Sequence, residues 1–179
     1  MKKLVFMFLA VASLLLTSCG TSYKIIGAYS DGNEFGETSL SYEEVWSKII
    51  DYFAVSGIPI TNIDKTSGII VSNNVSFENY YTREDKQGNL VNPNAFVVIP
   101  TIKGGFGNIL EPNAKLTGEW EMYGDWNVRI KPNGKGGTIV NVNLLNLRCF
   151  YGGSGMLGKT KIPIKSTGVF EKKMLDYLK

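Results

Sequence analysis

One stretch of the sequence matches a nucleotide-binding motif. Residues 153–160, GSGMLGKT, fit the P-loop pattern G-x-x-x-x-G-K-[ST], and their glycines also fit G-x-G-x-x-G. A P-loop needs its Lys and Thr at the start of a helix whose N-terminus binds the phosphates. Here Pro163 follows Lys159 by four residues, and only 19 residues remain after Thr160, too few for the further strand–helix units of a nucleotide-binding sheet. We therefore predict a glycine-rich connector and no bound nucleotide.

The residues of the common catalytic sites are missing. The chain contains no His, which excludes Ser-His and Cys-His nucleophiles and His-based zinc sites. Residues 31–34, DGNE, carry calcium-type ligands at a spacing that does not fit a calcium loop. Glu119 and Glu121 share one face of a predicted strand, which leaves a carboxylate-dependent hydrolase as one alternative. Such carboxylates are usually just solvated, so we predict a protein without catalytic residues, metal or cofactor.

The N-terminus has the pattern of an export signal. Lys2 and Lys3 precede an apolar run over residues 4–16, too short to cross a bilayer as a stable helix. The run ends in Leu-Thr-Ser-Cys at 16–19, which resembles the lipobox of bacterial lipoproteins. That resemblance implies a signal peptide over residues 1–18 and acyl chains on Cys19, so the first partner expected is a membrane. Gly20, where an inner-membrane protein would carry a retention Asp, implies the outer membrane, and the lack of an acidic cluster after Cys19 favours its periplasmic face.

The composition of the mature chain narrows its partners further. Cleavage before Cys19 removes 18 of 179 residues and leaves 161, enough for one domain with a core. It also removes two of the 19 basic residues. The mature chain then has 17 basic and 16 acidic residues, and its net charge is +1. A nearly neutral chain gives no electrostatic basis for binding nucleic acid. With Cys19 acylated, Cys149 has no disulfide partner in the chain.

Hydrophobic spacing predicts a tether followed by one domain over residues 39–179. Residues 19–38 are mostly small and polar, and Ile25-Ile26 is their one strongly apolar spot, with an edge strand as the alternative. Ser41 and Glu44 form a capping box that starts a helix. Its apolar stripe comprises Tyr42, Val45, Trp46, Ile49, Ile50 and Phe53. A second helical stripe occupies residues 167–178, with Lys172 and Lys173 outside it.

The residues between the helices predict strands and two long loops. Residues 58–63 form a short strand, and Ile69, Val71, Val75 and Phe77 share the buried face of the next one. Residues 95–99 form a third strand, flanked by loops at 82–94 and 103–117. A long hairpin follows over 118–131 and 138–150, with even positions of its first strand inward and a bend at Gly124. In its second strand the inward apolar residues stand at even positions up to Leu144 and at odd positions afterwards, at Leu145, Leu147 and Cys149. This change predicts a bulge near Leu144-Leu145.

This order of elements predicts an α+β fold. An antiparallel sheet would carry the N-terminal and C-terminal helices packed on one face, and Trp46, Trp120 and Trp126 would meet in the core between them. The residues Tyr42-x-x-Val45-Trp46, Gly57–Ile60, Asp64–Ile70 and Ser166–Glu171 then resemble a known family, the BamC-like domain of envelope lipoproteins. The chain is also similar to small lipoproteins of Bacteroidetes. The resemblance covers most of the mature chain in element order, and it implies a helix-grip fold and an accessory role in envelope assembly.

Three functional hypotheses follow. The first is a non-catalytic envelope lipoprotein that presents loops 79–94 and 103–117 to a protein partner, with Tyr80, Tyr81 and Phe106 as candidate contact residues. The second is a binder of a small apolar ligand such as a lipid, held in a groove lined by Trp46, Trp120 and Trp126. The third is the hydrolase that uses Glu119 and Glu121.

Overall fold

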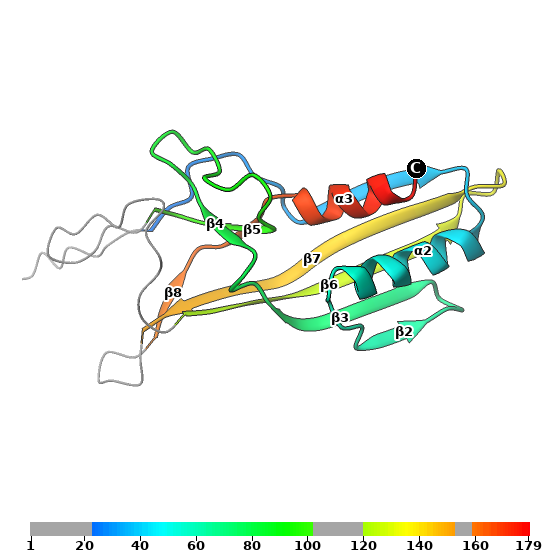
Figure 1. Ribbon diagram of the computed structural model, residues 1–179, viewed down its shortest axis with the longest axis horizontal. Helices are drawn as coiled ribbons and strands as arrows, with labels where there is room; N and C mark the ends of the chain where they lie inside the picture. The colour runs from blue at the N-terminus through cyan, green and yellow to red at the C-terminus, as the bar shows by residue number, and fades with distance from the viewer. Residues whose placement is uncertain (1–22, 102–119, 153–158) are drawn as a thin grey trace, which may run out of the picture.

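Two long antiparallel strands, β6 (Trp120–Pro132) and β7 (Thr138–Tyr151), form the centre of the protein (Figure 1). In this computed structural model, which describes residues 23–101, 120–152 and 159–179, the even positions of β6 from Met122 to Ile130 are all buried. The predicted alternation of this strand is therefore confirmed, because one face of β6 packs on the core and the other meets solvent. The turn at 133–137 also lies where it is predicted.

Four further strands complete a six-stranded, antiparallel sheet. Its order is β1-β7-β6-β3-β2, and β8 pairs with the far end of β7. The added strands are β1 (Asn33–Thr38), β2 (Asn62–Asp64), β3 (Ile69–Ser76) and β8 (Thr160–Ile162). Together with two helices, this sheet confirms the α+β class. The strand expected over 58–63 is shorter than predicted, because only its last two residues and Asp64 pair with β3.

Both irregularities predicted in the β6–β7 hairpin are present. The register shifts between Tyr123 and Asp125, opposite a residue of β7, Asn146, that has φ of 52°. The parity of buried residues in β7 accordingly changes between Leu144 and Cys149. The inward placement of Leu145 is wrong: its side chain is 48% exposed, because the extra residue follows Leu145 instead of preceding it.

The buried face of β3 is not the one expected. Ile70 and Ser72 are fully buried, whereas Ile69 and Val71 are only partly so. A second bulge, where the β3–β6 register shifts between Ser72 and Val75, then brings Val75 and Phe77 inward. The prediction assumed strict alternation from Ile69 to Phe77 and therefore did not include this bulge, in which Asn74 has a φ of 56°.

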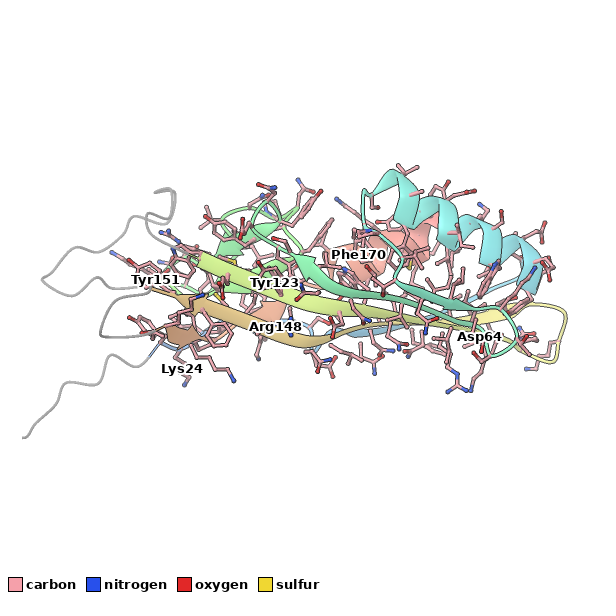
Figure 2. The ribbon with its side chains drawn as sticks, turned by 90° about the horizontal axis from the view of Figure 1, so that it is seen from below. Lys24, Asp64, Tyr123, Arg148, Tyr151 and Phe170 are labelled. Atoms are coloured by element: carbon pink, nitrogen blue, oxygen red, sulfur yellow. The ribbon has the colours of Figure 1, made fainter. Side chains whose placement is uncertain are left out.

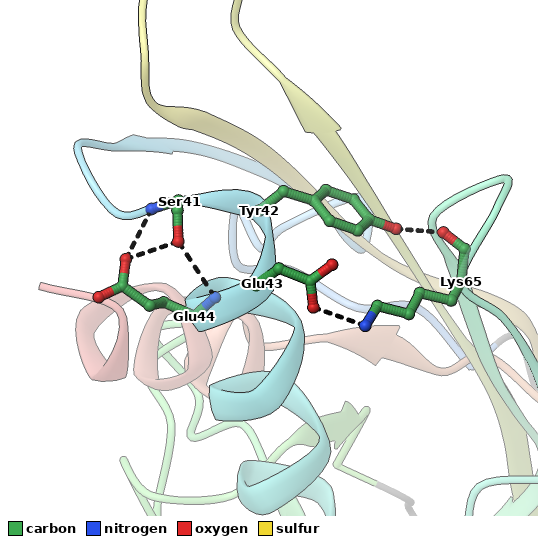
Figure 3. Close-up of polar contacts among 5 residues, drawn as sticks. All are labelled: Ser41, Tyr42, Glu43, Glu44 and Lys65. Carbon is green, nitrogen blue, oxygen red and sulfur yellow. Dashed lines mark hydrogen bonds and ion pairs between the residues drawn. The ribbon is translucent and has the colours of Figure 1, made fainter.

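Helix α2 (Tyr42–Val55) begins as predicted. The Ser41 hydroxyl accepts a hydrogen bond from the Glu44 backbone N–H at 3.4 Å, and the Glu44 carboxylate accepts one from the Ser41 N–H at 2.9 Å (Figure 3). Lys65, in the turn between β2 and β3, pairs with Glu43 at 2.5 Å and accepts a hydrogen bond from the Tyr42 hydroxyl at its carbonyl. The first turn of α2 is thus fixed both by its own cap and by the β2–β3 turn.

Helix α3 (Val169–Tyr177) joins the core through Phe170, which is fully buried. The Phe170 ring lies 4.1 Å from that of Trp126 on β6, 5.1 Å from that of Phe96 and 6.1 Å from that of Phe53 on α2, measured between centroids. Helix α3 also contacts β1 and β7, and α2 contacts β6. A single aromatic side chain therefore connects both helices to the sheet.

A second, smaller sheet includes a strand in the region expected to be a polar loop. Strand β4 (Tyr81–Arg83) pairs in parallel with β5 (Val97–Ile99), which pairs antiparallel with β9 (Lys165–Ser166). Three consecutive polar residues, Thr82, Arg83 and Glu84, are buried there. The loop prediction for 82–94 is wrong at its start, since polar composition masked a buried segment. The strand predicted over 95–99 is present but shorter, because only residues 97–99 pair with neighbouring strands.

The predicted tether also contains part of the domain. Residues 33–38, expected as its end, form β1 along β7, and residues 25–26 are not in a strand. Instead the backbone N–H groups of Ile26 and Gly27 donate to the side chain of Glu84. Within the described ranges, no helix is long and apolar enough to cross a membrane.

Candidate functional site

Strand β1 lies at the edge of the main sheet and offers unpaired backbone groups. The Leu144 N–H donates to the Gly32 carbonyl at 2.6 Å, so the even-numbered residues that follow in the same register turn their N–H and C=O groups toward β7. Phe35 and Glu37 therefore point theirs toward the open edge, where no described residue bonds them. The Asn33 N–H is already bonded to Asp31 Oδ1 at 3.1 Å.

A groove runs between this edge and helix α3. It has a volume of about 330 Å³, and its walls come from β1, from Val140 of β7, and from α3 with the two residues that follow the helix. The helix approaches β1 at Gly36, where an added Cβ would lie 2.8 Å from Leu175 Cδ2. A side chain at position 36 would therefore require the Leu175 side chain to move. We call this feature the β1–α3 groove.

Charges of both signs line the β1–α3 groove. Glu34 and Glu37 come from β1, while Lys172, Asp176 and Lys179 come from α3 and the residues after it. Lys179 Nζ and the Asp176 carboxylate form an ion pair at 2.5 Å. Phe35, whose side chain points to the face of β1 opposite Gly36 and α3, exposes 61% of its surface at the same edge. The combination suits recognition of a polypeptide, which has a backbone to pair and side chains of mixed character.

A buried carboxylate lies at the first turn of α3. Glu171 is completely buried; its Oε1 accepts a hydrogen bond from the Ser166 hydroxyl at 2.5 Å, and its Oε2 has no partner among the described residues. Burial raises the pKa of Glu171 above its ordinary value, against the opposing effect of the Ser166 hydrogen bond. The sequence analysis missed this residue because a Glu in a first helical turn is ordinarily solvent-exposed.

The three tryptophans do not share a groove. Trp126 is fully buried between Phe77 and Phe170, and Trp46 is buried on α2 beside Tyr42. Trp120, which is only partly buried, packs instead on Tyr151 at 4.7 Å. The prediction that the three meet in one place is therefore wrong: Phe170 fills the space next to Trp126.

The aromatic residues proposed for partner loops have separate surroundings. Tyr80 stacks on Phe96 with ring centroids 4.8 Å apart and stays 39% exposed, and Tyr81 is partly buried in β4. Phe106 and the loop 103–117 lie outside the described residues. The loop 79–94 is held by its own contacts: the Asp85 carboxylate accepts backbone hydrogen bonds from Gln87 and Asn89, each at 2.8 Å.

The remaining chemical candidates lie apart from one another. Glu121 pairs with Lys159, and Glu119 lies outside the described residues. Thr160 begins strand β8, whereas the P-loop pattern requires a helix there. Burial raises the pKa of the Cys149 thiol to about 12, so that this buried cysteine stays protonated. Over the described ranges, no three acidic or cysteine residues are arranged to hold a metal ion.

Comparison with known proteins adds no relative to this picture. No protein-family model and no curated protein sequence matches the chain. The resemblance to BamC-like domains and the acylation of Cys19 therefore stay predictions. The β1–α3 groove was missed in the sequence, because residues 33–38 contain a single apolar side chain, Phe35, and so lack the alternation that predicts a strand.

Proposed function

We propose that this protein is a non-catalytic lipoprotein of the outer membrane, anchored through Cys19, whose domain binds an extended segment of another envelope protein. The observation that carries the recognition part is the open edge of β1 beside the β1–α3 groove. Backbone groups of Phe35 and Glu37 face outward there without described partners, and a hollow of about 330 Å³ lies next to them.

An extended segment fits this place by adding a strand to the sheet. In such β-augmentation the edge backbone supplies the hydrogen bonds, and alternate side chains of the added strand enter an adjoining groove. The other free edge of the sheet is less suitable: β2 has three residues, against six for β1, and short edge strands pair poorly. The mixed charges of the groove favour a partner segment of mixed charge.

The proposal also includes the placement of the helices on the sheet. We assign both helices to one face of the sheet, in a helix-grip arrangement like that of BamC-like domains. The contacts of α2 with β6, of α3 with β1 and β7, and of the helices with each other support this assignment. In that arrangement the outer side of α3 and the edge of β1 stay available to a partner.

A proline at position 35 tests the recognition. Phe35→Pro removes one of the two outward N–H groups of β1, while the even-numbered residues keep their hydrogen bonds to β7; proline is tolerated at such positions of edge strands. We expect recovery of a partner from detergent-solubilised envelopes to fall about ten-fold, the effect of losing about 1.4 kcal/mol of edge pairing. Phe35→Ala, the matched control, keeps the N–H and should lose less.

Two measurements complete the test. Thermal unfolding of both variants shows whether the domain is intact. Hydrogen exchange at the Phe35 and Glu37 amides should slow when the recovered partner is added. Equal recovery with wild type and Phe35→Pro, or unchanged exchange at these amides, contradicts the proposed mode of binding. Mass spectrometry of the native protein tests the anchor, since the N-terminal residue should be an acylated Cys19.

A further inference from the structure

A second hollow, of about 410 Å³, lies where the chain enters the domain. Tyr23, Lys24 and Ile25 form one side of it, and residues 161–165 with Leu147 form the other. Figure 2 shows Lys24 and Tyr151 at one end of the domain and Asp64 at the opposite end. We call this feature the Lys24 hollow.

Among the described residues that line the Lys24 hollow, every charged side chain is basic. Lys24, Lys161 and Lys165 are all exposed, and none of the nine residues that line the hollow is acidic. The nearby Glu121 already forms an ion pair with Lys159. Three solvated ammonium groups around one depression form a site for an anion, and each has an aliphatic stem that can lie along an apolar surface.

The floor of the hollow is apolar. Ile25, Leu147, Pro163 and Ile164 contribute aliphatic surface to its lining. An apolar floor with a cationic rim matches the boundary between lipid headgroups and acyl chains, where cations meet phosphate and hydrocarbon surface is covered. A soluble anion would use only the rim.

The entering segment is held firmly beside residues 161–165. Glu84, which is 1% exposed, accepts hydrogen bonds from Ile26 N–H at 2.8 Å and Gly27 N–H at 2.9 Å. The Tyr29 hydroxyl adds a bond to the Gly88 carbonyl at 2.7 Å. Lys24 and Ile25 immediately precede these hydrogen-bonded residues, so their position relative to Lys161 and Lys165 is set by the fold.

The covalent chain also limits the distance from the hollow to the anchor. Tyr23 follows Cys19 by four residues, a span of at most about 14 Å. We propose that the Lys24 hollow binds the anionic phospholipid headgroups of the membrane that holds the acylated N-terminus. This inference rests on the proposed lipid anchor, and it means that the domain stands on the membrane on its Lys24 end.

The test uses the mature chain from residue 19 with Cys19→Ser, which has no acyl chains. Vesicles of phosphatidylethanolamine and phosphatidylglycerol at 3:1 should bind this protein in sedimentation, and vesicles of phosphatidylcholine should not. Each lysine near an anionic surface strengthens binding about five-fold, so replacing Lys24, Lys161 and Lys165 with Gln should weaken it about 100-fold. The matched control replaces Lys131, Lys135 and Lys173, which are exposed elsewhere on the domain, and should change binding little.

Several results of this experiment would contradict headgroup binding at the Lys24 hollow. Equal loss in both triple variants, or binding to neutral vesicles as strong as to anionic ones, overturns the inference. The inference is also overturned if millimolar inorganic phosphate displaces the protein from the sedimenting vesicles as completely as competing phosphatidylglycerol vesicles do. The site would then bind a soluble anion. If native Cys19 is acylated and only the vesicle result fails, the proposed anchor stands; an unmodified native Cys19 contradicts the anchor itself.

Discussion

The carboxylate of Glu84 accepts hydrogen bonds from the backbone N–H of Ile26, at 2.8 and 3.0 Å, although the two residues are 58 positions apart. Glycines allow the close approach: a Cβ on Gly27 would lie 2.4 Å from the Gly88 carbonyl oxygen. The chain that leads from the predicted anchor is thereby fastened to the smaller sheet. The domain thus begins well before residue 39, where the sequence analysis starts it.

We expect Glu84→Ala to release the segment around Ile26. The change leaves two backbone N–H groups without their acceptor and should lower the free energy of unfolding by about 2 kcal/mol. Hydrogen exchange measured by mass spectrometry should become faster than in the wild type, and the largest increase should lie in residues 23–29. Glu78→Ala, at an exposed position, is the control, and equal protection in both variants would contradict the role of Glu84.

The contact between Gly36 and Leu175 gives a second prediction. Because a Cβ at position 36 would lie 2.8 Å from Leu175 Cδ2, Gly36→Ala should destabilise the protein by about 1–2 kcal/mol through overpacking. Leu175→Ala removes the obstructing methyl groups, so in the double variant the added cost of Gly36→Ala should disappear. Denaturant unfolding of the four proteins measures this coupling, and strictly additive effects would show that α3 does not abut β1 at this point.

Glu171 predicts a pH dependence of stability. Its pKa is raised in the folded state, mainly by burial, with Glu34 adding to the shift and Ser166 and Lys172 opposing it. The folded protein therefore binds a proton more tightly than the unfolded chain, so this residue's contribution to stability is full below the ordinary Glu pKa and is lost as the pH rises through the raised value. Glu171→Gln should flatten the decline, measured by urea unfolding between pH 4 and pH 8. A variant that declines as steeply as wild type would contradict this assignment.

Elements that depend on neighbouring residues are readable in the sequence, whereas pairings between distant residues are not. Local signals were reliable: the capping box at Ser41, the alternation of β6 and the helical stripe at Phe170 depend on neighbouring residues, and all three are confirmed. The bend at Gly124 was also visible, because a glycine within an alternating strand leaves one inward position empty.

Long-range pairing was not visible in the sequence. Glu84 occurs in a polar run, and only the distant Ile26 and Gly27 make its burial favourable. Strand β1 was missed for a similar reason, since its partner β7 lies about a hundred residues later and supplies the burial that its own sequence lacks. The buried face of β3 was assigned wrongly because the bulge at Asn74 depends on Asp125, whose Oδ1 accepts the Asn74 N–H at 2.7 Å.

The bulge in β7 gives the last prediction. Asn146 has a φ of 52°, in the left-handed region, and its Nδ2 donates to Asp125 Oδ2 at 2.7 Å. Asn146→Gly keeps the backbone conformation accessible and should change stability by less than about 0.5 kcal/mol, whereas Asn146→Val forces a β-branched side chain into that region and should cost about 2 kcal/mol. The same change at Asn143, in the regular part of β7, should cost less, because valine favours extended backbone. Thermal unfolding of the three variants distinguishes the cases, and equal costs at 143 and 146 would contradict a bulge set by the backbone of Asn146.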